Sequence, residues 1–202
     1  MQNELIVQHG GIYTRLRALH GGIIRVTRTR RDAFLNSTSA SVVCMDKTPA
    51  SVQETEQDIC FATGNVTVLF SKSSGALTFL TPAGEVLLSE PDRRPCILQE
   101  KPVILHSYDS AQVKEGQSVD GARAWAEPSK TWQDRTAYEC RQNFVFDEDE
   151  GLYGLGSHEE GHGNLRGVGQ LLYQHNMKAV VPVLVSTKGW GLLFDMGCLM
   201  AF

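Results

Sequence analysis

Apolar and polar residues alternate along the middle of the chain, and turn-forming residues separate the alternating runs. The run VTVLFS covers residues 66–71, and the runs ALTFL (76–80) and EVLL (85–88) follow it after the turn-rich segments KSSG and TPAG. A period of two is typical of a half-buried strand, and turns of this length join antiparallel neighbours. The pattern therefore predicts a β-meander over residues 65–90.

Other β-branched and aromatic runs indicate further strands. They are IIRVT (23–27), SVVC (41–44), VIL (103–105) and FVF (144–146). The segment between Ser129 and Glu150 contains no Gly or Pro and could hold a helix, but its aromatic and apolar residues from Tyr138 to Phe146 recur with a period of two. We predict a strand there, and loops at the Ser-, Thr-, Gln- and Glu-rich residues 47–58 and 107–130. The expected fold is an all-β sandwich with little helix.

Composition limits the classes of partner. A chain of 202 residues with 42% hydrophobic content can bury the core of one large β-domain or two small ones. Its net charge of -4 gives no general attraction for nucleic acid or anionic lipid, so neither is expected as a partner. An early group of arginines lies among β-branched residues and is predicted to form the solvated face of strands. The group consists of Arg15, Arg17, Arg25, Arg28, Arg30 and Arg31.

The cysteines and the N-terminus suggest a protein of the cytoplasm. The five cysteines are widely spaced and form no CxxC pair, which argues against a zinc knuckle and a disulfide framework and favours buried free thiols. They are Cys44, Cys60, Cys96, Cys140 and Cys198. The N-terminus lacks a basic start before an apolar stretch, and no run reaches the ~20 apolar residues of a membrane span. We expect a soluble, cytoplasmic chain without a membrane partner.

Glycine and histidine are concentrated after the acidic run at residues 147–150. Seven of the 19 glycines lie between Gly151 and Gly169, and three of the six histidines lie between His158 and His175. Glycine adopts positive φ at little cost and lets the backbone approach a ligand closely. Polar and aromatic residues accompany these glycines, which favours a binding loop over a mobile connection. They are Tyr153, Asn164, Arg166, Tyr173, Gln174, His175 and Asn176.

The sequence His158-Glu159-Glu160-Gly161-His162 matches the HExxH signature of zinc proteases. That chemistry needs a helix, because only a helical turn places both imidazoles on the metal while the glutamate activates water. Glycines in and beside the motif each cost a helix roughly 1 kcal/mol, and no glutamate follows between Gly163 and Phe202 to act as a third ligand. We expect no metal site.

Three other catalytic patterns are incomplete. The Gly-x-Gly pairs lack the third glycine of a dinucleotide fingerprint and no βαβ unit follows them, so no cofactor is expected. Ser157 lacks the glycines that a GxSxG elbow requires two residues before and two residues after the serine, where Leu155 and Glu159 stand. Glu159 and Glu160 are adjacent, and their separation as a glycosidase pair cannot be judged from sequence. Asp195 ends an apolar strand and is predicted to be a structural hydrogen-bonding residue.

An ordered series of motifs in the last fifty residues resembles one known family. The motifs are YGLGSH (153–158), NLRG (164–167), QHNMK (174–178) and VPVLVSTKGWGLLFD (181–195). This series is similar to the end of the N-terminal domain of family-31 glycoside hydrolases, most of all to the bacterial α-xylosidase and α-glucosidase branch. The resemblance upstream is looser. Met196-Gly197-Cys198 departs from the polar, Asn-containing turn that is usual in the family after this strand.

The resemblance implies a galactose-mutarotase-like β-sandwich that spans residues 1–202 as one N-terminal domain. It further implies a retaining mechanism in which two aspartates lie on a (β/α)8 barrel that this chain does not contain. Phe194-Asp195-Met196 echoes the nucleophile motif of that barrel, but Asp195 falls where the family has the last Asp of the N-terminal domain. No residue of this chain is therefore expected to be catalytic, and the chain alone should be inactive.

In the family, the loop that corresponds to Ser157–Asn176 reaches toward the barrel and shapes the sugar pocket. Guanidinium, amide and imidazole groups in the loop can donate to or accept from sugar hydroxyls, and the same groups could instead satisfy loop carbonyls or contact the barrel. The expected partners are an oligosaccharide and the barrel, with self-association of the isolated chain through an exposed apolar patch. The alternative is a free-standing carbohydrate-binding sandwich. The candidate substrate-binding residues are His158, Asn164, Arg166, Gln174, His175 and Asn176.

Overall fold

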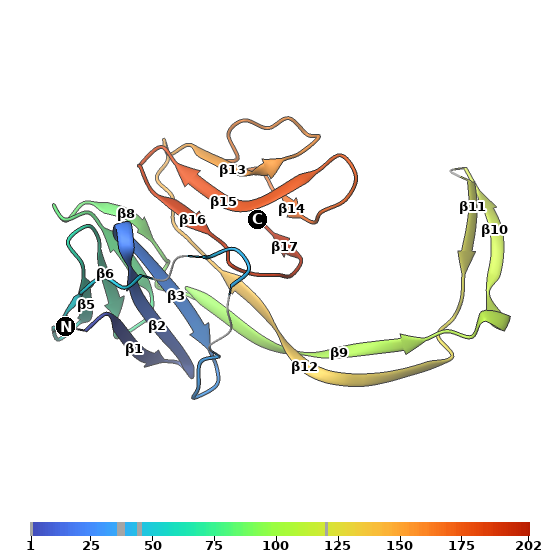
Figure 1. Cartoon of the computed structure of the whole chain (residues 1–202), viewed down its shortest axis with the longest axis horizontal. Coiled ribbons are helices and arrows are strands. Elements are labelled where there is room, and N and C mark those ends of the chain that lie inside the picture. The colour runs from blue at the N-terminus through green and yellow to red at the C-terminus, as the bar shows by residue number, and fades with distance from the viewer. Residues whose placement is uncertain (1, 36–38, 44–45, 120) are drawn as a thin grey trace. The chain divides into compact units, whose positions relative to one another are not determined.

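The computed structural model describes residues 2–35, 39–43, 46–119 and 121–202, and Cys44 lies outside these ranges. The chain divides into two compact units, which are drawn in Figure 1. Unit 1 consists of Met1–Pro95 and Gln142–Phe202, and unit 2 consists of Cys96–Arg141. Strands dominate both units, as the sequence predicts. Among the described residues, no helix is long and apolar enough to cross a membrane.

Unit 1 begins with two facing antiparallel sheets. The first has the order β1–β2–β3, and its strands are β1 (Glu4–His9), β2 (Ile12–Leu19) and β3 (Ile23–Thr29), with a short 3-10 turn η1 (His20–Gly22) before β3. The second has the order β4–β5–β6–β7–β8, and its strands are β4 (Ser51–Glu54), β5 (Asp58–Ala62), β6 (Thr67–Ser71), β7 (Leu77–Leu80) and β8 (Val86–Ser89). The predicted meander is confirmed by β6, β7 and β8.

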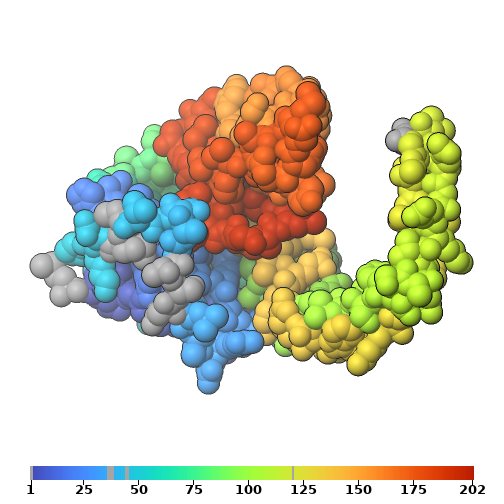
Figure 2. All heavy atoms as spheres, turned by 45° about the vertical axis from the view of Figure 1, so that its right-hand side comes forward, coloured from blue at the N-terminus to red at the C-terminus, as the bar shows by residue number. Residues whose placement is uncertain are grey.

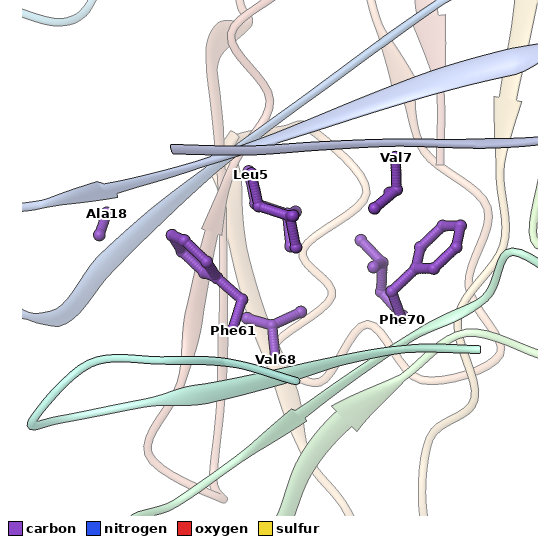
Figure 3. Packing of buried hydrophobic residues seen from close by; sticks show 8 residues of the cluster. Leu5, Val7, Ala18, Phe61, Val68 and Phe70 are labelled. Atoms are coloured by element: carbon purple, nitrogen blue, oxygen red, sulfur yellow. The ribbon is translucent and has the colours of Figure 1, made fainter. Parts of the chain in front are cut away.

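The core of this sandwich comes from alternate residues of the two sheets. Figure 3 shows Leu5, Val7 and Ala18 of the first sheet facing side chains of β5 and β6. Those side chains are Phe61, Val68 and Phe70. Because neighbouring residues of a strand point to opposite faces, the period of two in the sequence becomes one apolar layer per sheet. Phe61 and Val68 are completely buried in this layer.

A second module of unit 1 holds the C-terminal strands. A sheet of order β13–β15–β16 is formed by β13 (Leu152–Ser157), β15 (Ala179–Ser186) and β16 (Gly191–Leu193). The short strands β14 (Leu171–Leu172) and β17 (Met200–Ala201) pair with each other. Figure 2 shows these segments, orange to red, packed as one continuous mass. Their core contains Leu152, Leu155, Leu165, Leu172 and Leu184.

Two of the arginines predicted on a solvated face, Arg15 and Arg28, have buried side chains, which are 7% and 8% exposed. Arg15 is 6% exposed because β2 is the central strand of its sheet and Phe34 covers its guanidinium at 4.4 Å from the ring centroid. Burial lowers the pKa of Arg15, and the charge of Arg17 lowers it further. The prediction for these positions is wrong, because it assumed that a polar residue in an alternating strand faces water.

Arg28 lies in a buried polar cluster at the edge of the sandwich core. Its two terminal nitrogens donate to both carboxylate oxygens of Glu90, at 2.7 and 2.8 Å. Gln142 bridges the pair, because its Oε1 accepts from Arg28 at 2.5 Å and its Nε2 donates to Glu90 at 2.7 Å. The amide of Leu77 donates to Glu90 at 2.9 Å. Bidentate geometry and these added donors satisfy both buried charges.

Unit 2 is a pair of hairpins. In the described part of the chain, β9 (Cys96–Ser107) pairs with β12 (Lys130–Gln142), and β10 (Lys114–Ser118) pairs with β11 (Gly121–Trp125). A 3-10 turn, η2 (Ser110–Gln112), precedes β10. The strand predicted from Ser129 is thus confirmed as β12. The loop prediction for residues 107–130 is wrong at β10 and β11, and the one for residues 47–58 is wrong at β4, because backbone pairing can hold strands with polar side chains.

Three smaller predictions need correction. Residues 41–43 do not form a strand, and of the run Phe144–Phe146 only Val145 makes a bridge, to Ser89. Of the four described cysteines, Cys140 and Cys198 are exposed and Cys60 and Cys96 are partly exposed, so the expectation of buried thiols is wrong. Partial burial nevertheless raises the pKa of the Cys60 thiol.

Candidate functional site

The glycine-rich motif at residues 153–157 builds a close approach between β13 and β15. Gly154 and Gly156 have φ of 120° and 101°, and the register of the strands shifts between them. A Cβ on Gly154 would lie 2.3 Å from the carbonyl oxygen of Val183, and one on Gly156 would lie 2.0 Å from that of Ala179. Only glycine fits both positions. The irregularity turns Leu155, at φ 62°, inward, where it is completely buried.

The segment between β13 and β15, residues 158–178, is called the connecting loop below. Leu165 and Leu172 insert into the core with Leu155, and they are 4% and 5% exposed. The amide of Leu165 donates to the carbonyl of Leu152 at 2.8 Å, and β14 within the loop pairs with β17. The connecting loop is therefore anchored to the second module at several points along its length.

Three of the predicted sugar-binding residues satisfy the backbone of this region. The Nε2 of His158 lies 2.9 Å from the carbonyl of Leu155, and its other nitrogen is buried. Asn164 Oδ1 accepts from the amides of Leu152 and Arg166 at 3.2 and 3.0 Å. Gln174 Oε1 accepts from the amide of Val180 at 2.9 Å, while its Nε2 donates to backbone carbonyls. Through these contacts, His158, Asn164 and Gln174 stabilise the backbone of the connecting loop.

The other three predicted residues are exposed, as Asn164 and Gln174 also are. Arg166 donates from one terminal nitrogen to the carbonyl of Glu150 at 3.3 Å. This hydrogen bond uses one of the five N–H donors of its guanidinium group. His175 and Asn176 lie in the turn before β15, and both are exposed. The structure thus brings His175 and Asn176 together at the tip of a turn and keeps Arg166 in a separate turn of the connecting loop.

Two exposed neighbours of this tip add apolar surface. Tyr173 is 56% exposed, and its ring packs in a tilted arrangement against His175 with a centroid separation of 5.9 Å. Met177 has φ of 68° and is 73% exposed. An aromatic ring beside polar groups is a common way to hold a sugar ring through its apolar face. We refer to Tyr173, His175, Asn176 and Met177 as the turn tip.

Sequence reasoning missed an ion pair that closes the connecting loop. Lys178 Nζ lies 2.9 Å from Glu160 Oε1, and Gln170 Nε2 donates to Glu160 Oε2 at 3.4 Å. The hydrogen bond from Lys178 lowers the pKa of Glu160 to about 2. The available signal was the opposite charge of two residues that stand at the two ends of one loop.

The HExxH segment forms turns instead of a helix, so its two histidines do not share a helical face. Among the described residues, no group of three or more His, Cys, Asp or Glu side chains is placed to share a metal ion. Asp195 is held at 2.6 Å by both Arg25 and Ser39, which confirms the prediction of a structural hydrogen-bonding residue. It ties β3 and residue 39 to the end of the second module.

Comparison with known proteins agrees with this architecture. Residues 13–202 match the family described as the glycosyl hydrolase 31 N-terminal galactose mutarotase-like domain. An uncharacterized family 31 glucosidase of Pseudescherichia vulneris is 26% identical over 174 residues, which are 85% of this chain and 30% of that protein. An alpha-xylosidase of Saccharolobus solfataricus is 33% identical over 72 residues, 31% of this chain and 10% of that protein.

Solved structures show the same fold. The crystal structure of the GH31 alpha-xylosidase of Xanthomonas citri superimposes with a TM-score of 0.76 and 27% identity over 98% of this chain and 19% of that one. A GH31 alpha-xylosidase from a soil metagenome gives a TM-score of 0.71 at 19% identity, over 100% of this chain and 28% of that enzyme. The chain thus spans less than a third of the length of these relatives. It belongs to glycoside hydrolase family 31 and corresponds to the N-terminal galactose mutarotase-like domain of that family.

Proposed function

We propose that the chain is the non-catalytic N-terminal domain of a retaining α-glycosidase that releases terminal α-linked xylose or glucose from oligosaccharides. In this proposal the connecting loop forms one wall of the sugar pocket, and a catalytic (β/α)8 barrel supplies the two carboxylates. The observation that carries the proposal is the turn tip, where His175 and Asn176 are exposed beside an aromatic ring. The relatives support the substrate class, since the soil-metagenome alpha-xylosidase was crystallised with xylose.

The different roles of the loop side chains support a pocket wall with a fixed backbone. His158, Asn164 and Gln174 hold the backbone, while the turn tip and Arg166 keep polar groups at the surface. An amide and an imidazole can each donate to and accept from sugar hydroxyls, and Arg166 offers donors in a fixed fork. We assign sugar contact to His175 and Asn176 first and to Arg166 second.

An apolar sheet face supports packing on the barrel. The register places Tyr153 beside Val185, and Val183 beside Leu193, on the side of the sheet opposite Leu184. Val181 shares this face, and Tyr153, Val181, Val185 and Leu193 are 42–49% exposed. A continuous apolar face of this kind is unusual on a monomer and marks an interaction surface. The barrel is the proposed occupant, and the isolated chain should associate with itself through the same face.

Enzyme assays test the proposal directly. The purified chain should not turn over α-xylosides or α-glucosides, and measurable turnover would contradict its non-catalytic role. In the full-length enzyme, Asn176→Ala should raise KM about fivefold, because a polar contact to substrate contributes on the order of 1 kcal/mol. The control is Asn143→Ala, which removes a side chain bonded to the carbonyl of Arg94. Equal kinetics for the two variants would reject the pocket wall.

Two further measurements separate the proposal from a free-standing carbohydrate-binding sandwich. Calorimetry of the chain with xylose, glucose and isoprimeverose should detect no affinity, whereas the alternative requires binding without a barrel. Sedimentation should show self-association that Val185→Lys weakens. Ile23→Lys, at another exposed apolar position in unit 1, should leave it unchanged.

A further inference from the structure

One ion pair joins the two ends of the connecting loop. Glu160 stands in the turn that follows β13, and Lys178 immediately precedes β15. Their side chains meet at 2.9 Å across 18 residues of sequence. The glutamate belongs to the segment that resembles a zinc motif, and the lysine belongs to the motif QHNMK. The pair therefore connects two of the sequence motifs.

The surroundings of the pair differ from those of an ordinary surface ion pair. The side chain of Glu160 is 44% exposed, but that of Lys178 is only 12% exposed, and Gln170, which donates to the second oxygen of Glu160, is 4% exposed. The backbone of Gln170 is itself fixed, because its amide and carbonyl both bond to Phe202, at 2.9 and 2.8 Å. Glu160 thus receives one donor from each of two anchored parts of the loop.

Lys178 is also part of a turn that holds its own shape. Gln174 accepts from the amide of Val180 and donates to the carbonyls of His175 and Lys178, and the amide of Lys178 donates to His175 at 3.3 Å. His175 and Asn176 lie inside this closed turn. A shift of Lys178 would therefore move the turn as one body and carry both residues with it.

We propose that the Glu160–Lys178 pair, braced by Gln170, is a latch that fixes where the turn tip presents His175 and Asn176. This inference rests on the proposed function for its meaning, since the latch would set the geometry of a pocket wall. Glu160, Lys178 and Gln170 act as positioning residues and need no contact with sugar. The depressed pKa of Glu160, about 2, is consistent with a carboxylate that stays charged in the latch.

Amide hydrogen exchange of the chain tests the latch without any enzyme assay. Lys178→Met keeps the apolar stem and removes the charge, and it should speed exchange within residues 158–178 about three- to tenfold while leaving β1 to β8 unchanged. The matched control is Lys188→Met, which breaks the ion pair of Lys188 with Asp147 outside the loop. This control should leave exchange in the loop as it is in the parent chain.

Rescue by charge reversal and dependence on salt distinguish loss of the ion pair from general destabilisation of the loop. The double reversal E160K/K178E should restore slow exchange, and each single reversal should not. In the unmodified chain, raising the ionic strength from about 0.05 to about 1 M should speed exchange in the loop, because salt screens a partly exposed pair. Lys178→Met should abolish that salt response. The side-chain amide resonances of Asn176 should shift in the same variants that speed exchange.

The outcomes separate this inference from the proposed function. Unchanged exchange and unchanged Asn176 resonances in Lys178→Met would overturn the latch, whatever the enzyme assays show. Faster exchange with a raised KM and little change in kcat in the full-length enzyme would support both. Faster exchange with unaltered kinetics would keep the latch and reject the pocket wall. If a variant fails to fold, the unmodified chain still tests the latch: loop exchange that does not become faster at high ionic strength would overturn it.

Discussion

Units 1 and 2 are both built from antiparallel strands, but they bury their side chains very differently. In unit 1, two sheets face each other and enclose completely buried residues such as Phe61, Leu16 and Leu77. In unit 2, most residues of β9 and β12 are exposed, including Ile104 and Trp132 at 42% and 39%. Strand-forming patterns therefore produced strands in both units, whereas the buried cores of the described residues lie in unit 1, where a facing sheet or a packed loop covers the strands.

The contrast indicates where the stability of the chain resides. A two-stranded ribbon is marginally stable in water, because each side chain is covered on one side at most. Truncation of a side chain should therefore be costly in unit 1 and nearly neutral in unit 2. The three tryptophans allow each unit to be followed separately, since Trp190 lies in unit 1 and Trp125 and Trp132 lie in unit 2.

The largest effect is expected from Phe61→Ala. Phe61 is fully buried between the facing sheets, so its truncation should lower the free energy of unfolding of unit 1 by about 3–5 kcal/mol. Ile104→Ala, at an exposed position of β9, should change the free energy of unfolding of unit 2 by less than about 0.5 kcal/mol. Denaturant titration followed by Trp190 measures the first effect, and titration of a chain that keeps only Trp132 measures the second. Similar losses for the two variants would contradict a core confined to unit 1.

A comparable effect is expected from Glu90→Gln. The substitution leaves Arg28 buried without its carboxylate, and breaking a buried pair costs about 3–5 kcal/mol. Unit 2 supplies the control in Glu139→Gln, because Glu139 and Lys101 form an ion pair at 3.3 Å with side chains 53% and 50% exposed. That variant should lose less than about 0.5 kcal/mol. If Glu90→Gln were equally mild, Arg28 would not depend on the cluster.

A smaller effect is expected from Gly156→Ala, and its comparison with Gly121→Ala separates two causes. Both glycines have positive φ, 101° and 113°, so alanine is strained at each. At Gly156 the new Cβ would also meet the carbonyl of Ala179, whereas nothing lies within 4 Å at Gly121. We expect losses of about 2–3 kcal/mol and about 1 kcal/mol, respectively, in thermal unfolding. Equal losses would mean that β13 and β15 can move apart to accommodate the new Cβ at no cost in stability.

The sequence predicted strands best where alternation was strict and a facing layer existed, as in the meander of β6 to β8. It failed for β4, β10 and β11, because these strands are short and carry no clear period of two, although Val52 of β4 packs against the sandwich core. It also failed for Arg15, because a single strand does not reveal that both faces of its sheet are covered.

The candidate site shows the same limit. Glycine density identified the connecting loop correctly as an unusual structure, but it could not show which of the six polar side chains hold the loop backbone. An irregular loop leaves many amides and carbonyls without strand partners, and nearby side chains must satisfy them. His158, Asn164 and Gln174 serve that need, and only the fold shows which backbone groups they meet.

The smallest expected effect concerns the pH dependence of Glu160 and shows how an ion pair anchored in unit 1 behaves. Because the pKa of Glu160 falls from its ordinary 4.5 to about 2 on folding, the unfolded chain takes up the proton first as the pH decreases. The contribution of Glu160 to stability should therefore be complete above about pH 4.5 and should disappear progressively as the pH falls toward 2. Carboxyl-carbon NMR titration should find Glu160 largely ionised in the middle of this range and half-protonated near its lower end. In Lys178→Met its pKa should rise toward the ordinary value, and an unchanged titration in that variant would show that Lys178 does not hold the carboxylate.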